Sequence, residues 1–153
     1  MLWPFEAKAV TQEAVFPFRG VVNITQGYGN GMSTHMPAEC RAIDVTFSNR
    51  VYAPFDMKLV FIDYSEQGAH CVVFQSKEKV KLSNGKEEYV LILLAHDNSI
   101  SDIESEYTQG EAFYDMGTFG NASGAHVHFE CAIGEWKYAT ADHSGINDYN
   151  SYR

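Results

Sequence analysis

The chain has 153 residues and a mass of 17.2 kDa, enough for one domain with its own apolar core and too short for two domains of usual size. Apolar residues make up 45% of the sequence and charged residues 20%, which excludes fibrous and intrinsically disordered proteins. Twenty acidic against eleven basic residues give a formal charge of −9, so we expect no electrostatic binding to nucleic acid or to an anionic membrane surface.

From the sequence we expect neither a membrane span nor a leader sequence. Its longest purely apolar run is Val90–Ala95, far below the roughly 20 residues that a membrane-spanning helix needs. The first residues lack a basic stretch followed by an apolar one, so no signal peptide is expected. Of the three cysteines, Cys71 and Cys131 lie among apolar strand residues, and we expect both to be inert core residues.

Clusters of glycine and proline separate short runs with strand character, which predicts an all-β, mainly antiparallel sheet with long loops. In chain order, the predicted strands span residues 20–25, 41–47, 59–64, 71–75, 88–96 and 125–133. The Asn84-Gly85 pair between two strand-like runs predicts a β-hairpin. The spacing of apolar residues within 98–107 favours one or two helical turns.

The composition divides the chain into three parts. We expect the main domain to span residues 20–134, after an N-terminal segment of residues 1–19. Residues 135–153 are polar and show little periodicity, so they are expected to form a C-terminal tail that packs on the domain or extends from it.

The sharpest local feature is a pair of histidines near the end of the sequence. In a strand, His126, His128 and Glu130 share one face, while Val127 and Phe129 face the other side. A half-exposed strand that merely carries polar residues would show the same pattern. Glu130 is therefore either an acceptor that orients one histidine or a chance neighbour on that face.

Two further segments offer groups that complement the histidines. Cys40, Ala42 and Asp44 share one strand face, and His96 lies where an apolar strand enters a polar loop. Thiolate, carboxylate and imidazole all bind zinc, and three protein ligands leave a fourth position for a water whose pKa falls to about 7. Histidines that do not bind the metal can then move protons or stabilise charge.

In this order, the motifs resemble the lysostaphin/LytM-type zinc metallopeptidases. The resemblance covers roughly residues 20–134 and rests on five segments: Gln26–Gly29, Cys40–Asp44, Val51–Pro54, Ala95–His96 and Gly120–Glu130. It implies a largely antiparallel β fold and a zinc-dependent endopeptidase that cleaves peptide bonds in bacterial cell-wall peptidoglycan, in the cross-bridge or the stem peptide. It also implies that Asp44 and His128 bind zinc, while His96 and His126 are the two catalytic histidines without a metal bond.

One position departs from the family pattern, which has His-x-Gly-x-Asp where this chain has Cys40 to Asp44. We favour Cys40 as the third zinc ligand, because it shares strand parity with Asp44 and a thiolate binds zinc strongly. His35 is the alternative, although it has the opposite parity and Pro37 interrupts the strand between them. A thiolate donates more charge than an imidazole, so the Cys40 ligand predicts slower turnover.

The third interpretation is a chain that binds zinc weakly or not at all. It would then be a catalytically inactive family member that acts as a cell-wall-binding or hydrolase-activating module. In either case the expected partner is a peptidoglycan peptide and not nucleic acid. The expected location is extracytoplasmic, whether secreted, periplasmic or phage-associated, within a larger phage or cell-envelope assembly.

Overall fold

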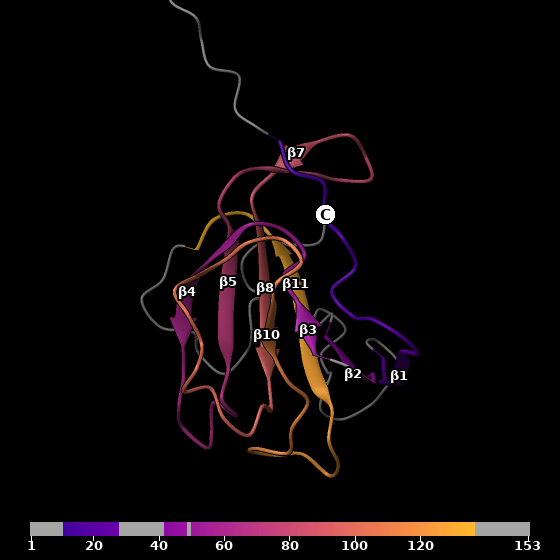
Figure 1. The fold of residues 1–153 in the computed structure, drawn as a ribbon, viewed down its shortest axis with the longest axis vertical. Coiled ribbons are helices and arrows are strands. Elements are labelled where there is room, and N and C mark those ends of the chain that lie inside the picture. The colour runs from indigo at the N-terminus through magenta and orange to yellow at the C-terminus, as the bar shows by residue number, and fades with distance from the viewer. Residues whose placement is uncertain (1–10, 28–41, 49, 137–153) are drawn as a thin grey trace, which may run out of the picture.

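The structure is a computed structural model that describes residues 11–27, 42–48 and 50–136. The regular structure of these residues consists of strands, without a helix (Figure 1). The strands are β1 (Asn23–Gln26), β2 (Ile43–Thr46), β3 (Val51–Tyr52), β4 (Met57–Ile62), β5 (Val72–Ser76), β6 (Val80–Lys81), β7 (Glu87–Glu88), β8 (Val90–Ala95), β9 (Glu106–Tyr107), β10 (Ala112–Tyr114) and β11 (Val127–Ile133).

Seven of these strands form one antiparallel sheet in the order β1-β2-β11-β8-β5-β4-β9. The predicted all-β class is confirmed, and each of the six predicted strands is present with its ends shifted by a few residues. β8 lies at the centre of the sheet, and all six of its residues are buried. Both faces of this strand are covered, so no face is exposed to solvent and polar residues do not alternate with apolar ones along it.

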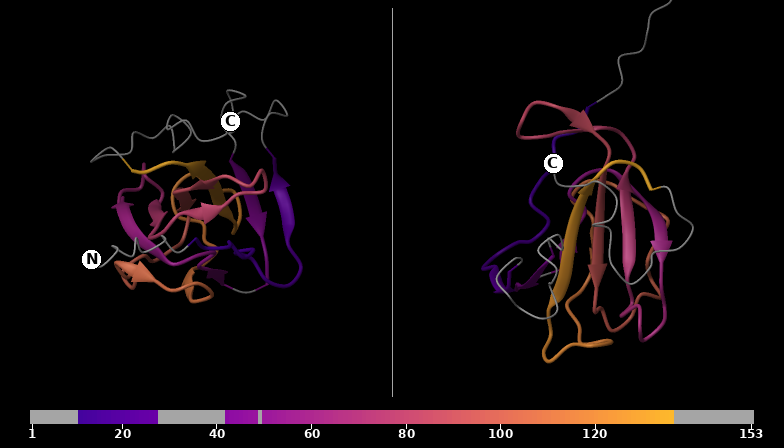
Figure 2. Two further views of the ribbon diagram at one scale, coloured as in Figure 1. Left: turned by 90° about the horizontal axis from the view of Figure 1, so that it is seen from above. Right: turned by 180° about the vertical axis from the view of Figure 1, so that it is seen from behind.

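The main core lies between this sheet and the smaller β10-β3 pair, which crosses one of its faces (Figure 2). The inward side chains of the large sheet include Val45, Phe74 and Val127, and the small sheet contributes Val51 and others. Each of these four side chains is at most 1% exposed. Alternate residues of β2, β5 and β11 therefore fill the core, which leaves the residues between them on the opposite face.

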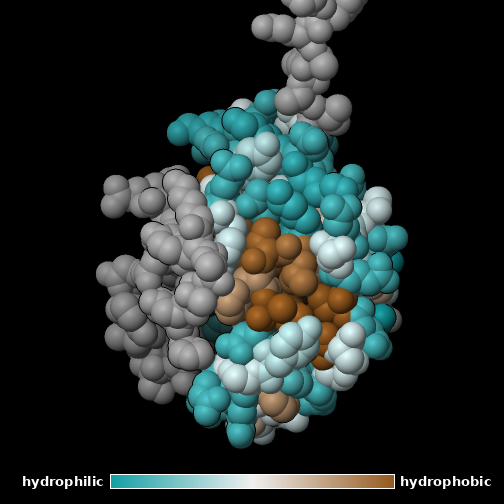
Figure 3. All heavy atoms as spheres, turned by 90° about the vertical axis from the view of Figure 1, so that its left-hand side faces the viewer, coloured by the Kyte–Doolittle hydropathy of each residue, from teal (hydrophilic) through white to brown (hydrophobic). Residues whose placement is uncertain are grey.

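The opposite face of the large sheet carries a second apolar cluster made of Cys71, Val73, Leu91, Leu93 and Ala132, with Val60, Phe61 and Trp136 packed against it. On the β4 side of the molecule, apolar atoms also gather at the surface (Figure 3). Ala132 pairs with Leu91 across β11 and β8, and Glu130 pairs with Leu93. His128 and Glu130 consequently lie on the same face as this second cluster.

The predicted hairpin is confirmed. Its strands are β6 and β7, and Gly85 in the turn has a φ of +82°. The Leu82 N–H donates to the Lys86 carbonyl at 2.8 Å, and the Lys86 N–H donates to Oδ1 of Asn84 at 2.9 Å. Asn-Gly suits this turn because glycine adopts a positive φ without strain and the Asn side chain bonds the backbone two residues later.

The helical turns predicted within residues 98–107 are wrong. The segment bends at Asn98, turns at Ser101 and Asp102, and then forms β9, which pairs with Met57 and Lys58 of β4. Ile100 and Tyr107 are buried in the main core. The apolar spacing that suggests a helix thus reflects contacts with the core, and strand pairing overrides a weak local preference.

Residues before position 20 contribute to the same core. The Pro17 carbonyl accepts the Tyr52 N–H at 2.9 Å, Phe18 is 4% exposed, and the Arg19 guanidinium lies 3.5 Å from the centroid of the Tyr52 ring. Gln12 forms a parallel bridge with Val80. The division at residue 20 stays a prediction, but residues 11–19 pack on the domain through these contacts.

Cys71 and Cys131 differ in exposure. Cys71 is buried, and burial raises the pKa of its thiol. Cys131 is exposed, so the prediction that both are core residues holds for Cys71 alone.

Within residues 11–27, 42–48 and 50–136, the structure has no helix of the length and hydropathy that a membrane span requires.

Tyr114 connects two of the loops at the end of the sheet. Its side chain is fully buried, and its hydroxyl accepts the Asp97 N–H at 3.1 Å and donates to the His70 carbonyl at 2.9 Å. Tyr114→Phe leaves the buried Asp97 N–H and the partly buried His70 carbonyl without this partner. We expect it to lower the free energy of unfolding by about 1–3 kcal/mol, measured by urea denaturation.

The matched control is Tyr64→Phe, because the Tyr64 side chain is 63% exposed. It should change the free energy of unfolding by less than about 0.5 kcal/mol. An equal loss in both variants would contradict the role assigned to the Tyr114 hydroxyl.

Candidate active site

Polar side chains from three neighbouring strands meet on the second face of the large sheet. His128 of β11 pairs with Asp44 of β2 on one side and with Ala95, the last residue of β8, on the other. His96 follows Ala95 directly. Paired residues in antiparallel strands project side chains to the same face, so this register brings Asp44 and His128 together and places His96 beside them.

Two carboxylates flank the His128 ring. Nδ1 lies 3.2 Å from Oδ1 of Asp44, and Nε2 lies 2.9 Å from Oε1 of Glu130. Asp44 is 8% exposed and Glu130 is 3% exposed. Burial acts to lower the pKa of His128, but the hydrogen bonds to Asp44 and Glu130 outweigh it and raise the pKa to about 9.

His126 and His96 lie next to this group. Nε2 of His126 is 3.6 Å from Oδ2 of Asp44, and the His126 and His96 ring centroids are 4.5 Å apart. The His96 and His128 centroids are 6.2 Å apart. Burial lowers the pKa of His96, so its neutral form is favoured at neutral pH.

Backbone carbonyls fix the tautomers of these two histidines. Nδ1 of His96 lies 2.8 Å from the Phe119 carbonyl oxygen, and Nδ1 of His126 lies 2.8 Å from the Gly124 carbonyl oxygen. A carbonyl only accepts hydrogen bonds, so each Nδ1 must carry a proton. In the neutral ring Nε2 is then a proton acceptor, which is the form that a general base requires.

The structure therefore brings together Asp44, His96, His126 and His128, which are four of the residues selected from the sequence. Their catalytic and metal-binding roles stay predictions. Cys40 and the alternative His35 lie outside the described residues. Sequence reasoning left the part played by Glu130 open, and the structure places its carboxylate against His128.

The sequence does not predict that the Phe119 and Gly124 carbonyls accept hydrogen bonds from the His96 and His126 rings. Every residue carries a carbonyl, so no residue type identifies one as a hydrogen-bond acceptor. The only available signal is the glycine content of residues 117–124, which indicates a loop whose backbone approaches its neighbours closely.

The donor set of Asp44 and His128 fits a zinc ion. Two ligands at about 2.0–2.1 Å from a tetrahedral zinc are separated by about 3.3 Å, and Oδ1 of Asp44 and Nδ1 of His128 are 3.2 Å apart. Histidines that bind zinc commonly donate their other ring N–H to a carboxylate, which is the position of Glu130. Among the residues that the structure describes, no group of three or more His, Cys, Asp or Glu side chains is arranged to hold a metal ion. The described residues therefore offer Asp44 and His128 as two candidate zinc ligands, and their metal-binding role stays a prediction.

Comparisons with known proteins support the fold. No family model and no curated protein sequence matches the chain. Among solved structures, a catalytic domain of the prophage-encoded M23 protein EnpA from Enterococcus faecalis aligns with a TM-score of 0.52 and 18% identity, over 78% of this chain and 87% of that one. A zinc-containing peptidase from Vibrio cholerae aligns with a TM-score of 0.53 and 16% identity, over 88% of this chain and 40% of that one.

The catalytic domain of the antimicrobial peptidase lysostaphin from Staphylococcus simulans also matches, with a TM-score of 0.48, 16% identity and coverage of 75% of this chain and 80% of that one. The chain shares its all-β fold with the EnpA catalytic domain and the Vibrio cholerae peptidase, two matches with TM-scores above 0.5. At these identities the likeness is one of fold.

The protonated His128 ring lies between the Asp44 and Glu130 carboxylates, so the stability of the metal-free protein should depend on pH. A histidine whose pKa rises on folding stabilises the fold fully below its unfolded value of about 6.5. That contribution is lost as the pH rises through about 9. We expect the free energy of unfolding to fall across this window, and Glu130→Gln to lower the His128 pKa in an NMR titration.

Glu135→Gln is the control, because Glu135 is exposed and has the same charge change. An unchanged His128 pKa in Glu130→Gln would show that the Glu130 carboxylate does not hold the proton on the ring.

Proposed function

We propose that this chain is a zinc-dependent endopeptidase that cleaves peptide bonds in bacterial cell-wall peptidoglycan, in the cross-bridge or the stem peptide. The observation that carries the proposal is the convergence of Asp44 and His128 with two histidines whose Nδ1 protons are held by carbonyls. A fold shared with lysostaphin-type peptidase domains adds to it.

The residues divide into two roles under this proposal. Asp44 and His128 would hold zinc together with Cys40, or with His35 in its place. The bound zinc would supply an activated water and polarise the peptide carbonyl. With Nδ1 protonated, neutral His96 and His126 each present a proton-accepting Nε2. They would take up the proton of the attacking water and, once protonated, donate to the carbonyl oxygen or the leaving amine.

Glu130 and Asp44 have separate tasks in this scheme. Glu130 accepts from Nε2 of His128 and so keeps Nδ1 of that ring directed towards Asp44. Oδ2 of Asp44 lies 3.6 Å from Nε2 of His126, so a proton taken up at Nε2 would face this carboxylate.

The proposed surroundings follow from the same substrate. Peptidoglycan lies outside the cytoplasmic membrane, so the protein would act outside the cytoplasm, as a secreted, periplasmic or phage-associated enzyme. One matched structure is a prophage-encoded protein, which supports the phage-associated case. A place in a larger phage or cell-envelope assembly is part of the same proposal.

The first test combines zinc content with peptidoglycan digestion. We expect about one zinc per chain in the parent and loss of both zinc and digestion in Asp44→Asn and His128→Ala. His96→Ala and His126→Ala should keep the zinc while their turnover falls about 10²–10⁴-fold, the usual contribution of a general acid or base. No zinc and no digestion in a zinc-replete parent would favour the non-catalytic cell-wall-binding or hydrolase-activating module.

The third ligand is identified by comparing Cys40→Ser with His35→Ala. We expect Cys40→Ser to lose zinc and His35→Ala to keep it, because a serine hydroxyl is a much weaker ligand than a thiolate. Cys131→Ser is the matched control, since it removes an exposed thiol elsewhere. The reverse pattern would assign the position to His35.

The effect of a thiolate ligand is tested by Cys40→His. An imidazole donates less charge to zinc, so we expect faster turnover than in the parent at equal zinc occupancy. Equal or slower turnover would show that the thiolate does not limit the reaction.

A further inference from the structure

His96 adopts a backbone conformation that its surroundings must impose. Its φ is +86°, which is uncommon for a residue with a side chain. Its N–H donates to the Ala69 carbonyl at 2.7 Å, and its carbonyl accepts the Phe119 N–H at 3.1 Å. Because Nδ1 donates to the Phe119 carbonyl as well, Phe119 bonds both the backbone and the ring of His96.

His70 lies directly against Phe119. The two rings are stacked with centroids 3.5 Å apart and an interplanar angle of 6°. Nδ1 of His70 donates to the Asp97 carbonyl at 2.7 Å, and the His70 carbonyl accepts the Tyr114 hydroxyl at 2.9 Å. His70 is therefore held at its ring edge and at its backbone, and its flat face supports Phe119.

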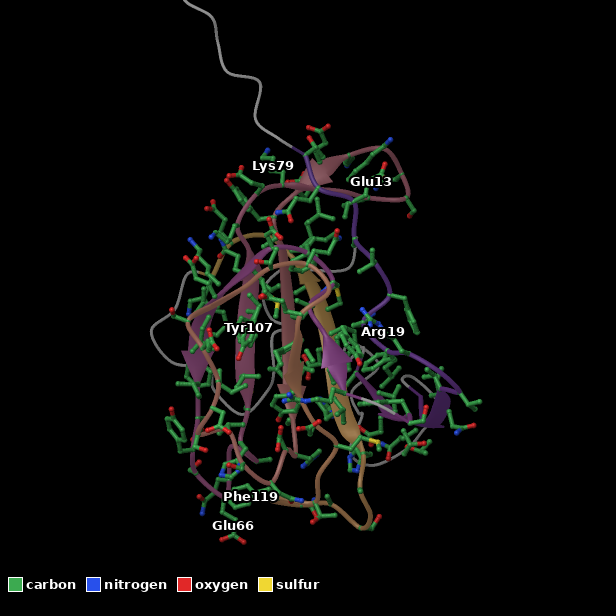
Figure 4. The ribbon with its side chains drawn as sticks, viewed as in Figure 1. Glu13, Arg19, Glu66, Lys79, Tyr107 and Phe119 are labelled. Atoms are coloured by element: carbon green, nitrogen blue, oxygen red, sulfur yellow. The ribbon has the colours of Figure 1, made fainter. Side chains whose placement is uncertain are left out.

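The loop between β10 and β11, which contains Phe119, also packs closely against the turn between β4 and β5. A Cβ on Gly120 would lie 2.7 Å from the Ala69 Cβ and 3.0 Å from the Glu66 carbonyl oxygen. A Cβ on Gly117 would collide with the His96 carbonyl oxygen. Phe119 and Glu66 accordingly appear beside each other at the end of the sheet (Figure 4).

We propose that His70 is a positioning residue for the peptidase reaction: its stack on Phe119 holds the carbonyl that accepts the Nδ1 proton of His96. The effect on turnover rests on the proposed function, whereas the effect on the His96 ring does not. Without the stack, the Phe119 carbonyl loses its fixed position and neutral His96 populates both tautomers. The fraction with a protonated Nε2 has no lone pair there to accept a proton.

The test uses two variants that remove the stack from opposite sides. His70→Asn suits the backbone, because Asn tolerates the φ of +54° at this position and keeps an N–H donor for the Asp97 carbonyl. Phe119→Ala keeps its carbonyl but loses its ring. Phe119→Tyr retains the stack and serves as the conservative variant, and Phe16→Ala removes an aromatic ring that is 68% exposed elsewhere.

The first readout is the ring ¹⁵N spectrum of His96, which distinguishes a protonated nitrogen from one that carries a lone pair. We expect a single Nδ1-protonated tautomer in the parent, in Phe119→Tyr and in Phe16→Ala. Mixed tautomers are expected in His70→Asn and in Phe119→Ala. A single unchanged tautomer in both of these variants would overturn the proposal.

The second readout is peptidoglycan turnover at equal zinc content. His70→Asn and Phe119→Ala should lower kcat by about tenfold to a hundredfold, the scale expected for a small misplacement of a catalytic group. KM and zinc content should stay at parent values, and Phe119→Tyr should recover the parent kcat. Unchanged kcat in both stack-removing variants of an active parent would also overturn the proposal.

The two readouts separate this inference from the proposed function. A parent that digests no peptidoglycan contradicts the proposed function, and the His96 tautomer then decides on His70 alone. If His70→Asn does not fold, Phe119→Ala provides the same comparison from the other ring.

Discussion

The register of β11 between β2 and β8 is the constraint on which the candidate site depends. It places His128 opposite Asp44 on one side and opposite Ala95 on the other. A shift of one residue would send His128 into the main core and Val127 out to the site face. Val127 is fully buried against the main core, so packing on the far face of the sheet holds the polar group in place.

Much of this arrangement is predictable from alternation along single strands. The alternation places His126, His128 and Glu130 on one face of their strand. In the other strand it separately places Asp44 and Val45 on different faces. The strand order is not predictable in the same way, because the contact between Asp44 and His128 joins residues 84 positions apart. Local patterns contain no information on which strands pair, and it is the family resemblance that connects the two segments.

The sequence-based predictions that differ from the structure, and the features that the sequence did not predict, also have local causes. β3, β9 and β10 contain two or three residues each, too few for a period of two to be recognised. The spacing of Ile100 and Tyr107 resembles a helix because both side chains reach the same core, Ile100 from a loop and Tyr107 from β9. The carbonyls that fix the His96 and His126 tautomers leave no mark on residue type. The third metal ligand, Cys40 or His35, lies outside the described residues and stays a prediction.

The tautomers of both histidines depend on one loop, since the Phe119 and Gly124 carbonyls lie five residues apart between β10 and β11. A loop at the end of a sheet opens at lower free energy than the central strands of that sheet. Warming would release this loop while β8 and its neighbours remain paired. The Nδ1 protons of the two histidines would then lose their carbonyl acceptors together, before the β structure is lost.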